Sequence, residues 1–397
     1  MIKRLFFFYH YLWSFFGALI FRFPSRRIKV FGITGTKGKT TTVALLSYIF
    51  NKAKIKNSAL SSVWRKVGDK QERNLTGNSM PGRFLMQGFL NEAAKNSCSY
   101  AFVEVTSQGI VQSRHRFIDW DGAVFLDIHP EHIESHGSFE NYLKAKVSFF
   151  EHIAKKTSKN PVFFINKKDL HWEEFADASK AFTTKLFSSD DVNDFGISQN
   201  LGGDFNKINI AAAVAIAREE KISEDIIRNA VKDFEGVIGR VEFVQKEPFS
   251  VVVDYAHTPD SLEEIYKFLS GYKKSDKKLI CVLGSAGGGR DKWKRPKMGE
   301  MAAKYCDSII LTNEDPYDEQ PENIINEIES GCSQIQNSKF EILKITNRKE
   351  AIKKAISLAK EGDVVVCTGK GSETSIHIDG GKIISWSERD VVKEILK

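Results

Sequence analysis

Residues 28–50 read IKVFGITGTKGKTTTVALLSYIF, in which an apolar run, a glycine-containing turn and a helical pattern follow one another. Residues 28–33 have the length and apolar character of a strand. Residues 40–50 repeat apolar side chains at helical spacing, which predicts a helix. A strand, a glycine turn and a helix in this order predict a phosphate-binding loop, because backbone N–H groups at a helix N-terminus attract anions.

The turn also carries side chains that nucleotide chemistry needs. Gly35 and Gly38 let the backbone approach a ligand closely. Lys39 can reach terminal phosphates, and the Thr40 hydroxyl can hold Mg²⁺. The general pattern G-x-x-x-x-G-K-[ST] is not matched, because Ile33 occupies the position of its first glycine. The alternative is a strand–helix turn without a ligand, but Gly-Lys-Thr-Thr at the helix start favours nucleotide binding.

The composition is that of a large globular chain. Its 397 residues, 42% of them hydrophobic, are enough for two or three domains. Lys and Arg number 58 against 51 Asp and Glu, a net charge of +7 without long basic blocks, so nucleic-acid binding is not expected. The five cysteines are scattered without a C-x-x-C pair, which indicates reduced core residues and neither a zinc site nor a disulfide framework.

The first 27 residues contain an apolar, aromatic run at residues 5–21 with basic residues on both sides. The run is near the lower length limit for crossing a bilayer. A signal peptide is not indicated, because no small-residue cleavage site follows. Two interpretations stay open: a helix packed on the protein or on a partner, or peripheral contact with the inner face of a membrane. A cytoplasmic location is expected, with or without that association.

Apolar runs of strand length alternate with helical stretches along the rest of the chain, which predicts an α/β fold with a mainly parallel sheet. Strands are expected at 101–105, 123–128 and 162–165, and helices at 83–94, 140–153 and 208–217. A second block has strands at 251–253, 279–283, 309–311 and 364–367. We therefore expect a hydrophobic helix with a linker (1–27), a central P-loop-type domain (28–236) and a Rossmann-like C-terminal domain (237–397).

Two further groups of polar residues suggest ligand binding. Glu104 ends an apolar strand, where α/β folds place ligands, and its carboxylate could hold Mg²⁺. The alternative is a carboxylate that simply faces solvent. His129, His132 and His136 cluster ahead of a helix. Their spacing permits zinc, but no cysteine supports it, and polar loop residues are the alternative.

Eight motifs in this order resemble those of the Mur ligase family, ATP-dependent enzymes that form amide bonds, and are most similar to the branch of UDP-N-acetylmuramoyl-tripeptide synthetases. The motifs are TGTKGKTTT (34–42), EVTSQGIVQSR (104–114), PEHIESHGSFENYLKAK (130–146), GDFNKIN (203–209), GRVEFV (239–244), VVVDYAHTPDSLE (251–263), GSAGGGRDKWKRPKMG (284–299) and TGKGSE (368–373).

The resemblance implies roles for individual residues. The ATP phosphate loop would comprise Gly35, Thr36, Lys37, Gly38, Lys39, Thr40 and Thr41. The catalytic residues would be Lys39, Glu104, His132 and Lys146. The magnesium ligands would be Thr40, Glu104, His132 and, when carbamylated, Lys146. Further nucleotide contacts would come from Asn206, Asn209, Arg240, Asp254 and His257. The substrates would contact Ser107, Gln112, Arg114, Asp315, Lys370, Gly371 and Glu373.

The reaction that the resemblance implies is ADP-forming acid–amino-acid ligation through an acyl phosphate, with ATP and Mg²⁺ as cofactors. The donor would be a peptide or nucleotide-sugar-peptide carboxylate of cell-wall synthesis and the amine an amino acid, which places the chain in peptidoglycan biosynthesis. A monomer is expected. One alternative is a Mur-like ligase with a non-UDP substrate, as in poly-γ-glutamate capsule synthesis. The other is a nucleotide-binding scaffold without ligase activity. Against it stands the retention of Lys39, Thr40, Glu104, His132 and Lys146, since a scaffold does not need both metal positions.

The sequence departs from this family in three places. Only about 27 residues precede the ATP domain, so no N-terminal UDP-binding domain is expected and the donor need not be a UDP-muramoyl peptide. Residues 314–317 read EDPY where the family has D-N-P-R, so Tyr317 replaces the arginine that pairs with the distal carboxylate of diaminopimelate. Gln108 stands where this branch has histidine, and no consequence is assigned to it.

Overall fold

The computed structural model describes residues 2–82, 84–289, 292–335 and 340–397, and only the backbone of residues 2–8. Arg83, the predicted start of a helix, and Arg290 and Asp291, in the motif at 284–299, lie outside the described residues. The chain divides into two compact units. Unit 1 consists of residues 1–198 and 205–235, and unit 2 of residues 199–204 and 236–397.

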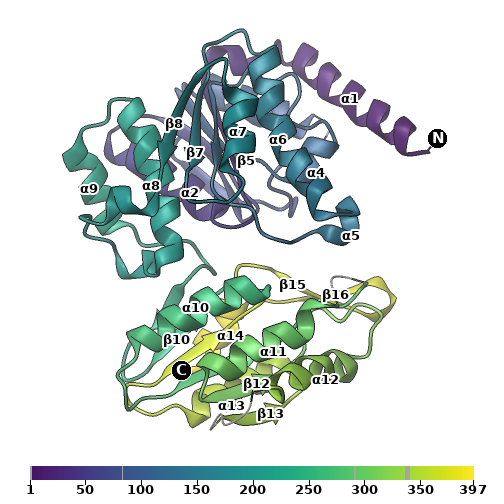
Figure 1. Cartoon of the computed structure of the whole chain (residues 1–397), viewed down its shortest axis with the longest axis vertical. Coiled ribbons are helices and arrows are strands. Elements are labelled where there is room, and N and C mark those ends of the chain that lie inside the picture. The colour runs from purple at the N-terminus through teal and green to yellow at the C-terminus, as the bar shows by residue number, and fades with distance from the viewer. Residues whose placement is uncertain (1, 83, 290–291, 336–339) are drawn as a thin grey trace. The chain divides into compact units, whose positions relative to one another are not determined.

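Unit 1 is built on an eight-stranded sheet with the order β4-β3-β2-β5-β1-β6-β7-β8. Figure 1 labels three of its strands, β5, β7 and β8. The six strands from β2 to β8 in this order run parallel, and β3 and β4 are added antiparallel at one edge. The predicted mainly parallel sheet is thereby confirmed. The strands are β1 (Lys29–Thr34), β2 (Asn57–Leu60), β3 (Trp64–Val67), β4 (Lys70–Arg73), β5 (Tyr100–Glu104), β6 (Gly122–Phe125), β7 (Val162–Asn166) and β8 (Thr183–Phe187).

Helices cover both faces of this sheet, because alternate strand residues point to opposite sides. Val30 and Val103 belong to a core that includes Phe149 of α6. On the opposite face, Phe102 lies 4.8 Å from Phe50 of α2 between ring centroids. The helices of unit 1 are α1 (Ile2–Ile20), α2 (Lys39–Lys52), α3 (Leu85–Lys95), α4 (Ser107–Val111), α5 (Ile133–His136), α6 (Phe139–Lys156), α7 (Trp172–Ser179), α8 (Asp204–Glu219) and α9 (Glu224–Asp233).

The strand predicted at residues 123–128 is shorter than expected. β6 ends at Phe125, and the next three residues leave the ladder with β7. The Asp127 carboxylate turns toward the phosphate loop and accepts a hydrogen bond from the Thr36 N–H at 2.7 Å. The backbone N–H of Ile128 donates to Asp169 at 2.8 Å. Side-chain acceptors thus join the backbone hydrogen bonds that continue here, from Leu126 N–H to the Thr34 carbonyl and from Thr36 N–H to the Asp127 carbonyl.

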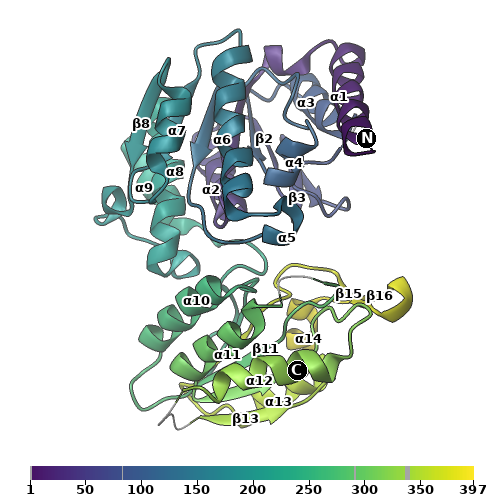
Figure 2. The same ribbon diagram turned by 45° about the vertical axis from the view of Figure 1, so that its right-hand side comes forward.

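Helix α1 packs on unit 1 with one of its faces (Figure 2). The ring centroids of Trp13 and Phe84 lie 4.9 Å apart, and Ser14 Oγ donates to the carbonyl of Ser113 at 3.0 Å. The other face exposes apolar side chains, with Leu19 51% and Ile20 63% exposed. Residues 9–20 thus pack on the protein, as the first of the two interpretations expects. In the part of the chain that the structure describes, no helix is long and apolar enough to span a membrane.

Unit 2 contains a six-stranded sheet with the order β13-β12-β11-β14-β10-β9, in which only β9 is antiparallel to its neighbour. Val251, Val253 and Val365 pack with α13 and α14 in one core. Figures 1 and 2 show α10, α11 and α12 side by side. These elements are β9 (Glu242–Gln245), β10 (Ser250–Val253), β11 (Leu279–Leu283), β12 (Ser308–Leu311), β13 (Glu341–Lys344), β14 (Val364–Cys367), the hairpin β15 (Ser375–Ile378) and β16 (Lys382–Ser385), α10 (Pro259–Tyr272), α11 (Lys294–Tyr305), α12 (Pro321–Cys332), α13 (Arg348–Leu358) and α14 (Glu388–Ile395).

Candidate active site

The predicted phosphate loop connects β1 to α2. Gly38 is the N-cap residue of α2 and has a φ of 78°, a conformation that favours glycine. A Cβ atom at Gly38 would lie 1.8 Å from Oδ1 of Asn209, so a larger residue has no room there. Lys39 Nζ donates to the carbonyl oxygens of Gly35 and Thr36, each at 2.8 Å. The loop is therefore tightly folded, and its lysine lies over it.

The contact with Gly38 brings α8 to the phosphate loop. Asn206 and Asn209 are both buried on this helix, and Asn209 Nδ2 donates to Asn206 Oδ1 at 2.9 Å. Because Asn209 touches Gly38, the two predicted nucleotide contacts lie beside the loop despite their separation in the sequence.

Two residues that the sequence analysis missed hold the loop in place. Asp127 Oδ1 accepts hydrogen bonds from the N–H groups of Thr36 and Lys37, at 2.7 and 2.9 Å. The Tyr142 hydroxyl lies 3.1 Å from Thr36 Oγ1. The signal for Asp127 was its position after β6, which neighbours β1 in the sheet, but the overlong strand prediction concealed it.

Glu104 at the end of β5 meets the phosphate loop directly. Its carboxylate accepts a hydrogen bond from the Thr40 hydroxyl and another from the Ser62 N–H at 3.1 Å. Glu104 is buried, and both groups in its contact with Thr40 are oxygen donors of the kind that Mg²⁺ prefers. The pair therefore fits a magnesium site. Among the described residues, no group of three or more His, Cys, Asp or Glu side chains forms a ready metal site.

Lys146 on α6 contacts the same loop. Its side chain is buried, and Nζ donates to the Gly35 carbonyl at 2.7 Å and to Thr34 Oγ1 at 3.4 Å. Burial, reinforced by the charge of Lys39, lowers the pKa of Lys146 well below its ordinary value, and nearby carboxylates only partly oppose this shift. The shift favours the neutral form of this amine over the charged form.

His132 is the N-cap residue of the short helix α5. It has a positive φ of 57°, and its side chain is about half exposed. Its Nε2 atom lies 3.8 Å from a carboxylate oxygen of Glu131, and its ring centroid lies 5.8 Å from that of Tyr142. Since Tyr142 also bonds to Thr36, His132 is linked to the phosphate loop through one intervening side chain.

The predicted substrate residues of unit 1 lie on and after α4, which follows Glu104. Ser107 is buried, and its Oγ lies 3.0 Å from Nε2 of His136. Arg114 donates to the Gln112 side chain and to the carbonyl of Met80. Arg114 is partly buried, and this burial lowers the pKa of its guanidinium.

The predicted nucleotide contacts of unit 2 surround Tyr255. The Arg240 guanidinium lies over the Tyr255 ring, 4.1 Å from its centroid, and the His257 ring lies 4.6 Å from it. Asp254 accepts from the N–H groups of Val241 at 2.8 Å and Ala256 at 2.7 Å. Burial raises the pKa of Asp254 even though Arg240 opposes this shift.

Three of the predicted substrate residues of unit 2 form an ionic cluster in which Lys370 and Asp315 are buried and Glu373 is partly exposed. Lys370 Nζ lies 2.9 Å from both carboxylate oxygens of Asp315 and 2.6 Å from Glu373. Burial lowers the pKa of Lys370, but the carboxylates of Glu373, Asp315 and Glu314 outweigh it, so the net pKa is raised and the amine stays charged. Tyr255 connects the two groups of unit 2, because its hydroxyl lies 3.2 Å from Glu373.

One glycine contact and one aromatic pair lie beside this cluster. A Cβ atom at Gly371, whose φ is 49°, would lie 2.7 Å from Cβ of Tyr255, so only glycine fits there. Tyr317, at the position of the missing arginine, stacks on His377 with centroids 5.1 Å apart and planes 16° apart. The His377 N–H donates to Asp315 at 2.8 Å, so this aromatic pair is tied to the ionic cluster.

Comparisons with known proteins agree with this arrangement. A profile described as Mur ligase middle domain matches residues 33–193, and one described as Mur ligase, glutamate ligase domain matches residues 239–371. A UDP-N-acetylmuramoyl-L-alanyl-D-glutamate--2,6-diaminopimelate ligase of Syntrophomonas wolfei is 34% identical over 397 residues, which cover 94% of this chain and 79% of the relative. The ligase of that name from Aquifex aeolicus is 35% identical over 390 residues, covering 94% and 78%.

Solved structures show the same relationship. A structure of a UDP-N-acetylmuramoyl-L-alanyl-D-glutamate--2,6-diaminopimelate ligase has a TM-score of 0.62 at 26% identity and covers 93% of this chain and 78% of its own. Mycobacterium tuberculosis folylpolyglutamate synthase shares the fold, with a TM-score of 0.70 at 16% identity over 90% of this chain and 92% of its own. The resemblance seen in the motifs is confirmed: the chain belongs to the Mur ligase family of ATP-dependent acid–amino-acid ligases.

Proposed function

We propose that the protein joins an amino acid to the peptide carboxylate of a peptidoglycan precursor, with ATP as the energy source. The observation that carries this proposal is the convergence of Lys39, Thr40, Glu104 and Lys146 on one phosphate loop. Its relatives are named for adding diaminopimelate to UDP-N-acetylmuramoyl-L-alanyl-D-glutamate, which supports a UDP-muramoyl peptide as the donor. We propose residues 28–236 as the ATP-binding domain and residues 237–397 as the C-terminal ligase domain.

In the proposed reaction, the donor carboxylate attacks the γ-phosphorus of ATP and forms an acyl phosphate and ADP. The amino group of the amino acid then attacks the acyl carbon, and inorganic phosphate leaves. Lys39 offsets negative charge on the phosphoryl group during its transfer. Asn209 and Asp127 hold the loop backbone around it. Bound Mg²⁺, for which Thr40, Glu104, His132 and carbamylated Lys146 are the proposed ligands, would offset further charge on the phosphates.

The low pKa of Lys146 supports its carbamylation, because only the neutral amine can add to CO₂. The resulting carbamate would be an oxygen-bearing anion at the end of the side chain. Its position beside Gly35 would bring that anion to the phosphate loop. This buried site would also shield the carbamate from solvent.

We propose that unit 2 selects the amino acid that supplies the amine. The proposed contacts with this substrate are Asp315, Lys370, Gly371 and Glu373. At residue 317 a guanidinium could form paired hydrogen bonds with a distal carboxylate, and tyrosine cannot. Instead, Tyr317 and His377 offer a flat aromatic surface. We therefore propose an amino acid other than diaminopimelate, with a side chain that lies against aromatic rings.

The decisive experiment supplies the purified protein with ATP, Mg²⁺, UDP-N-acetylmuramoyl-L-alanyl-D-glutamate and pools of amino acids. Phosphate release is expected to depend on both donor and amine, and mass spectrometry should find a product one residue longer. Diaminopimelate should be a poorer amine than the best member of the pools. ATP binding without amine-dependent phosphate release in any pool, including pools of non-UDP peptide donors, would instead favour a scaffold.

A second proposal concerns the exposed face of α1. We propose a cytoplasmic monomer that touches the inner membrane face through Phe16, Leu19 and Ile20, with Arg22 and Arg26 beside them. These apolar side chains are about half exposed, and exposed arginines at the end of the helix suit anionic lipid headgroups.

Vesicle flotation tests this contact. Binding to anionic vesicles should exceed binding to phosphatidylcholine vesicles, and Leu19→Gln with Ile20→Gln should reduce it by about tenfold, since two large apolar side chains leave the interface. Leu170→Gln is the matched control, because Leu170 is 93% exposed elsewhere on unit 1. Equal flotation of the wild-type and double-variant proteins would refute the membrane contact.

A further inference from the structure

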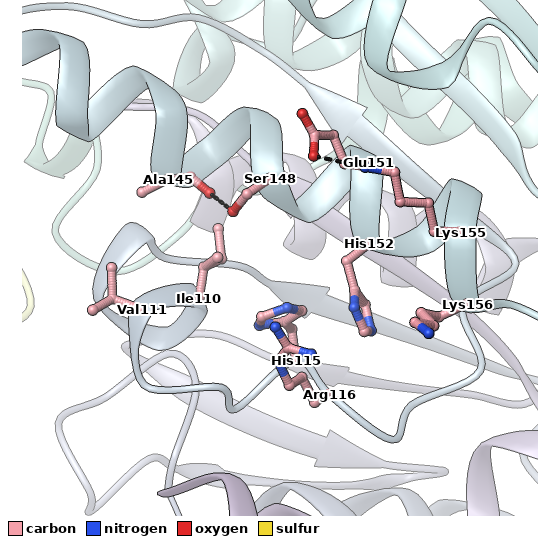
Figure 3. A pocket seen from close by; sticks show the side chains of 10 residues that line it. All are labelled: Ile110, Val111, His115, Arg116, Ala145, Ser148, Glu151, His152, Lys155 and Lys156. Atoms are coloured by element: carbon pink, nitrogen blue, oxygen red, sulfur yellow. Dashed lines mark hydrogen bonds and ion pairs between the residues drawn. The ribbon is translucent and has the colours of Figure 1, made fainter. Parts of the chain in front are cut away.

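Unit 1 has a cavity of about 460 Å³ that none of the predicted site residues lines. It lies between α4, the chain that follows α4, and one side of α6 (Figure 3). Both helices also carry predicted site residues, Ser107 on α4 and Lys146 on α6. The ligase chemistry gives this cavity no role.

The cavity is apolar at one end and basic at the other. Figure 3 shows Ile110 and Val111 at one end and Lys155 and Lys156 at the opposite end. Glu151 is the one carboxylate residue of the lining, and it pairs with Lys155 at 3.2 Å. With Arg116, three cationic side chains therefore face one carboxylate.

Two imidazole rings lie between these ends. The ring centroids of His115 and His152 are 4.7 Å apart and the planes nearly perpendicular. His115 is 3% exposed, and its Nδ1 has no hydrogen-bond partner among the described residues. Such a buried polar atom calls for an explanation, because leaving it unpaired costs free energy.

The cationic groups make the cavity electrostatically positive. Burial, with added repulsion from His152 and Arg116, lowers the pKa of His115 well below its ordinary value. Burial, Arg116 and Lys156 lower the pKa of His152 to about 4. Both rings are therefore neutral at pH 7, and the surroundings disfavour any additional positive charge. Such surroundings favour a negatively charged ligand.

Ordinary structural roles account for these residues only one at a time. Lysines in the last turn of α6 favourably offset the helix dipole. The Arg116 guanidinium lies over the Tyr11 ring, 5.5 Å from its centroid. Neither role explains why cations from two separate elements meet at a cavity that also contains a buried, unpaired imidazole nitrogen.

We propose that this cavity binds a ligand with a phosphate group and an apolar body. The phosphate would lie near Arg116 and Lys156, and the apolar body beside Ile110 and Val111. A phosphate matches the site better than a carboxylate, because it carries up to two negative charges and more acceptor oxygens for the guanidinium fork. A soluble phosphate ester and a phospholipid headgroup share this chemistry. The proposal is independent of the ligase reaction.

Phenyl phosphate is the probe, since it joins a phosphate to a flat apolar ring. The ring-proton NMR signals of His152, assigned with the His152→Gln variant, should shift saturably as phenyl phosphate is added. The titration of His152 should move to higher pH, because a nearby anion favours the imidazolium form. Benzyl alcohol, which lacks the phosphate, should bind at least about tenfold more weakly. An equal response to both compounds, or no response, would overturn the proposal.

Variants then separate this cavity from the phosphate loop and from α1. Arg116→Gln with Lys156→Gln should weaken phenyl phosphate binding by about tenfold or more, since two charge-assisted contacts are lost. Lys144→Gln removes an exposed lysine of α6 outside the cavity. This variant should change the affinity for phenyl phosphate by less than about twofold. Equal affinity of the double variant and the wild type would refute the site. If the double variant does not fold, the exposed Lys156→Gln alone serves the same comparison.

The same variants identify the source of the phosphate. Phosphatidic acid and phosphatidylcholine vesicles form one arm, and inorganic phosphate and phenyl phosphate form the other. Preferential binding of phosphatidic acid vesicles that falls with Arg116→Gln and Lys156→Gln would assign a lipid headgroup. Phenyl phosphate binding without such vesicle dependence would assign a soluble phosphate ester.

Discussion

Lys39→Ala is expected to lower the rate of acyl-phosphate formation on the order of 10²–10³-fold, the usual loss when one charge-stabilising group is removed from a transition state. Lys39 Nζ donates hydrogen bonds to the carbonyl oxygens of Gly35 and Thr36. These two hydrogen bonds keep the ammonium group of Lys39 at the phosphate loop, where it can offset charge on a phosphoryl group. Hydroxylamine trapping of the acyl phosphate, measured in single-turnover mixtures with the donor, gives the rate directly.

The control for this variant is Lys52→Ala at the far end of the same helix. The Lys52 side chain is 42% exposed and pairs with Asp233 at the surface, so its loss should leave the rate within about twofold. Lys39→Arg should recover only part of the activity, because a guanidinium differs from an ammonium in shape and hydration. Near wild-type trapping by Lys39→Ala would show that this lysine is not the phosphate-binding residue.

Lys146→Met is expected to lower turnover by about 10²-fold or more if the carbamate helps to hold the phosphates. Methionine fills the buried space but can neither form a carbamate nor donate to Gly35. The wild-type protein supplied with ¹³C-labelled CO₂ should give a carbamate carbonyl signal in the NMR spectrum, and the variant should not. Wild-type turnover should also fall when CO₂ is removed from the buffer.

Lys144→Met is the matched variant, since Lys144 is an exposed lysine two positions earlier on α6. It should keep both the carbonyl signal and the turnover. A signal that persists in Lys146→Met would assign the carbamate to another lysine. Wild-type turnover that is indifferent to CO₂ would leave Lys146 with its present role as a hydrogen-bond donor to the loop.

The parts of the site that could be predicted are those whose residues lie close together in the sequence or at the ends of predicted strands. The place of Lys39 and Thr40 at the start of α2 could be predicted because a strand, a glycine turn and a helix lie within 23 consecutive residues. Glu104 was predictable because strand ends of a parallel sheet meet at one edge, and its contact with Thr40 is consistent with the proposed metal role. The metal and substrate assignments themselves stay predictions.

Other features needed the tertiary structure. The hydrogen bonds of Asp127 depend on β6 lying next to β1, which no local pattern encodes. Tyr255 links Arg240 to Glu373 through contacts across more than a hundred residues of sequence. The strands β3 and β4 were missed because they are short and largely polar, so their sequences lack an apolar run. The packed face of α1 could not be identified either, because apolar and aromatic residues are spread over most of that helix.

The Asp127 contact has a thermodynamic consequence for the phosphate loop. Two of its N–H groups already point inward to a carboxylate, so the loop backbone is fixed during folding of unit 1. The conformational entropy of ordering these residues is then lost once, when the chain folds, and is not subtracted from the affinity of each incoming nucleotide. The Asp127 carboxylate thus holds the loop in one conformation, and a phosphate group can bind to that conformation without ordering the loop again.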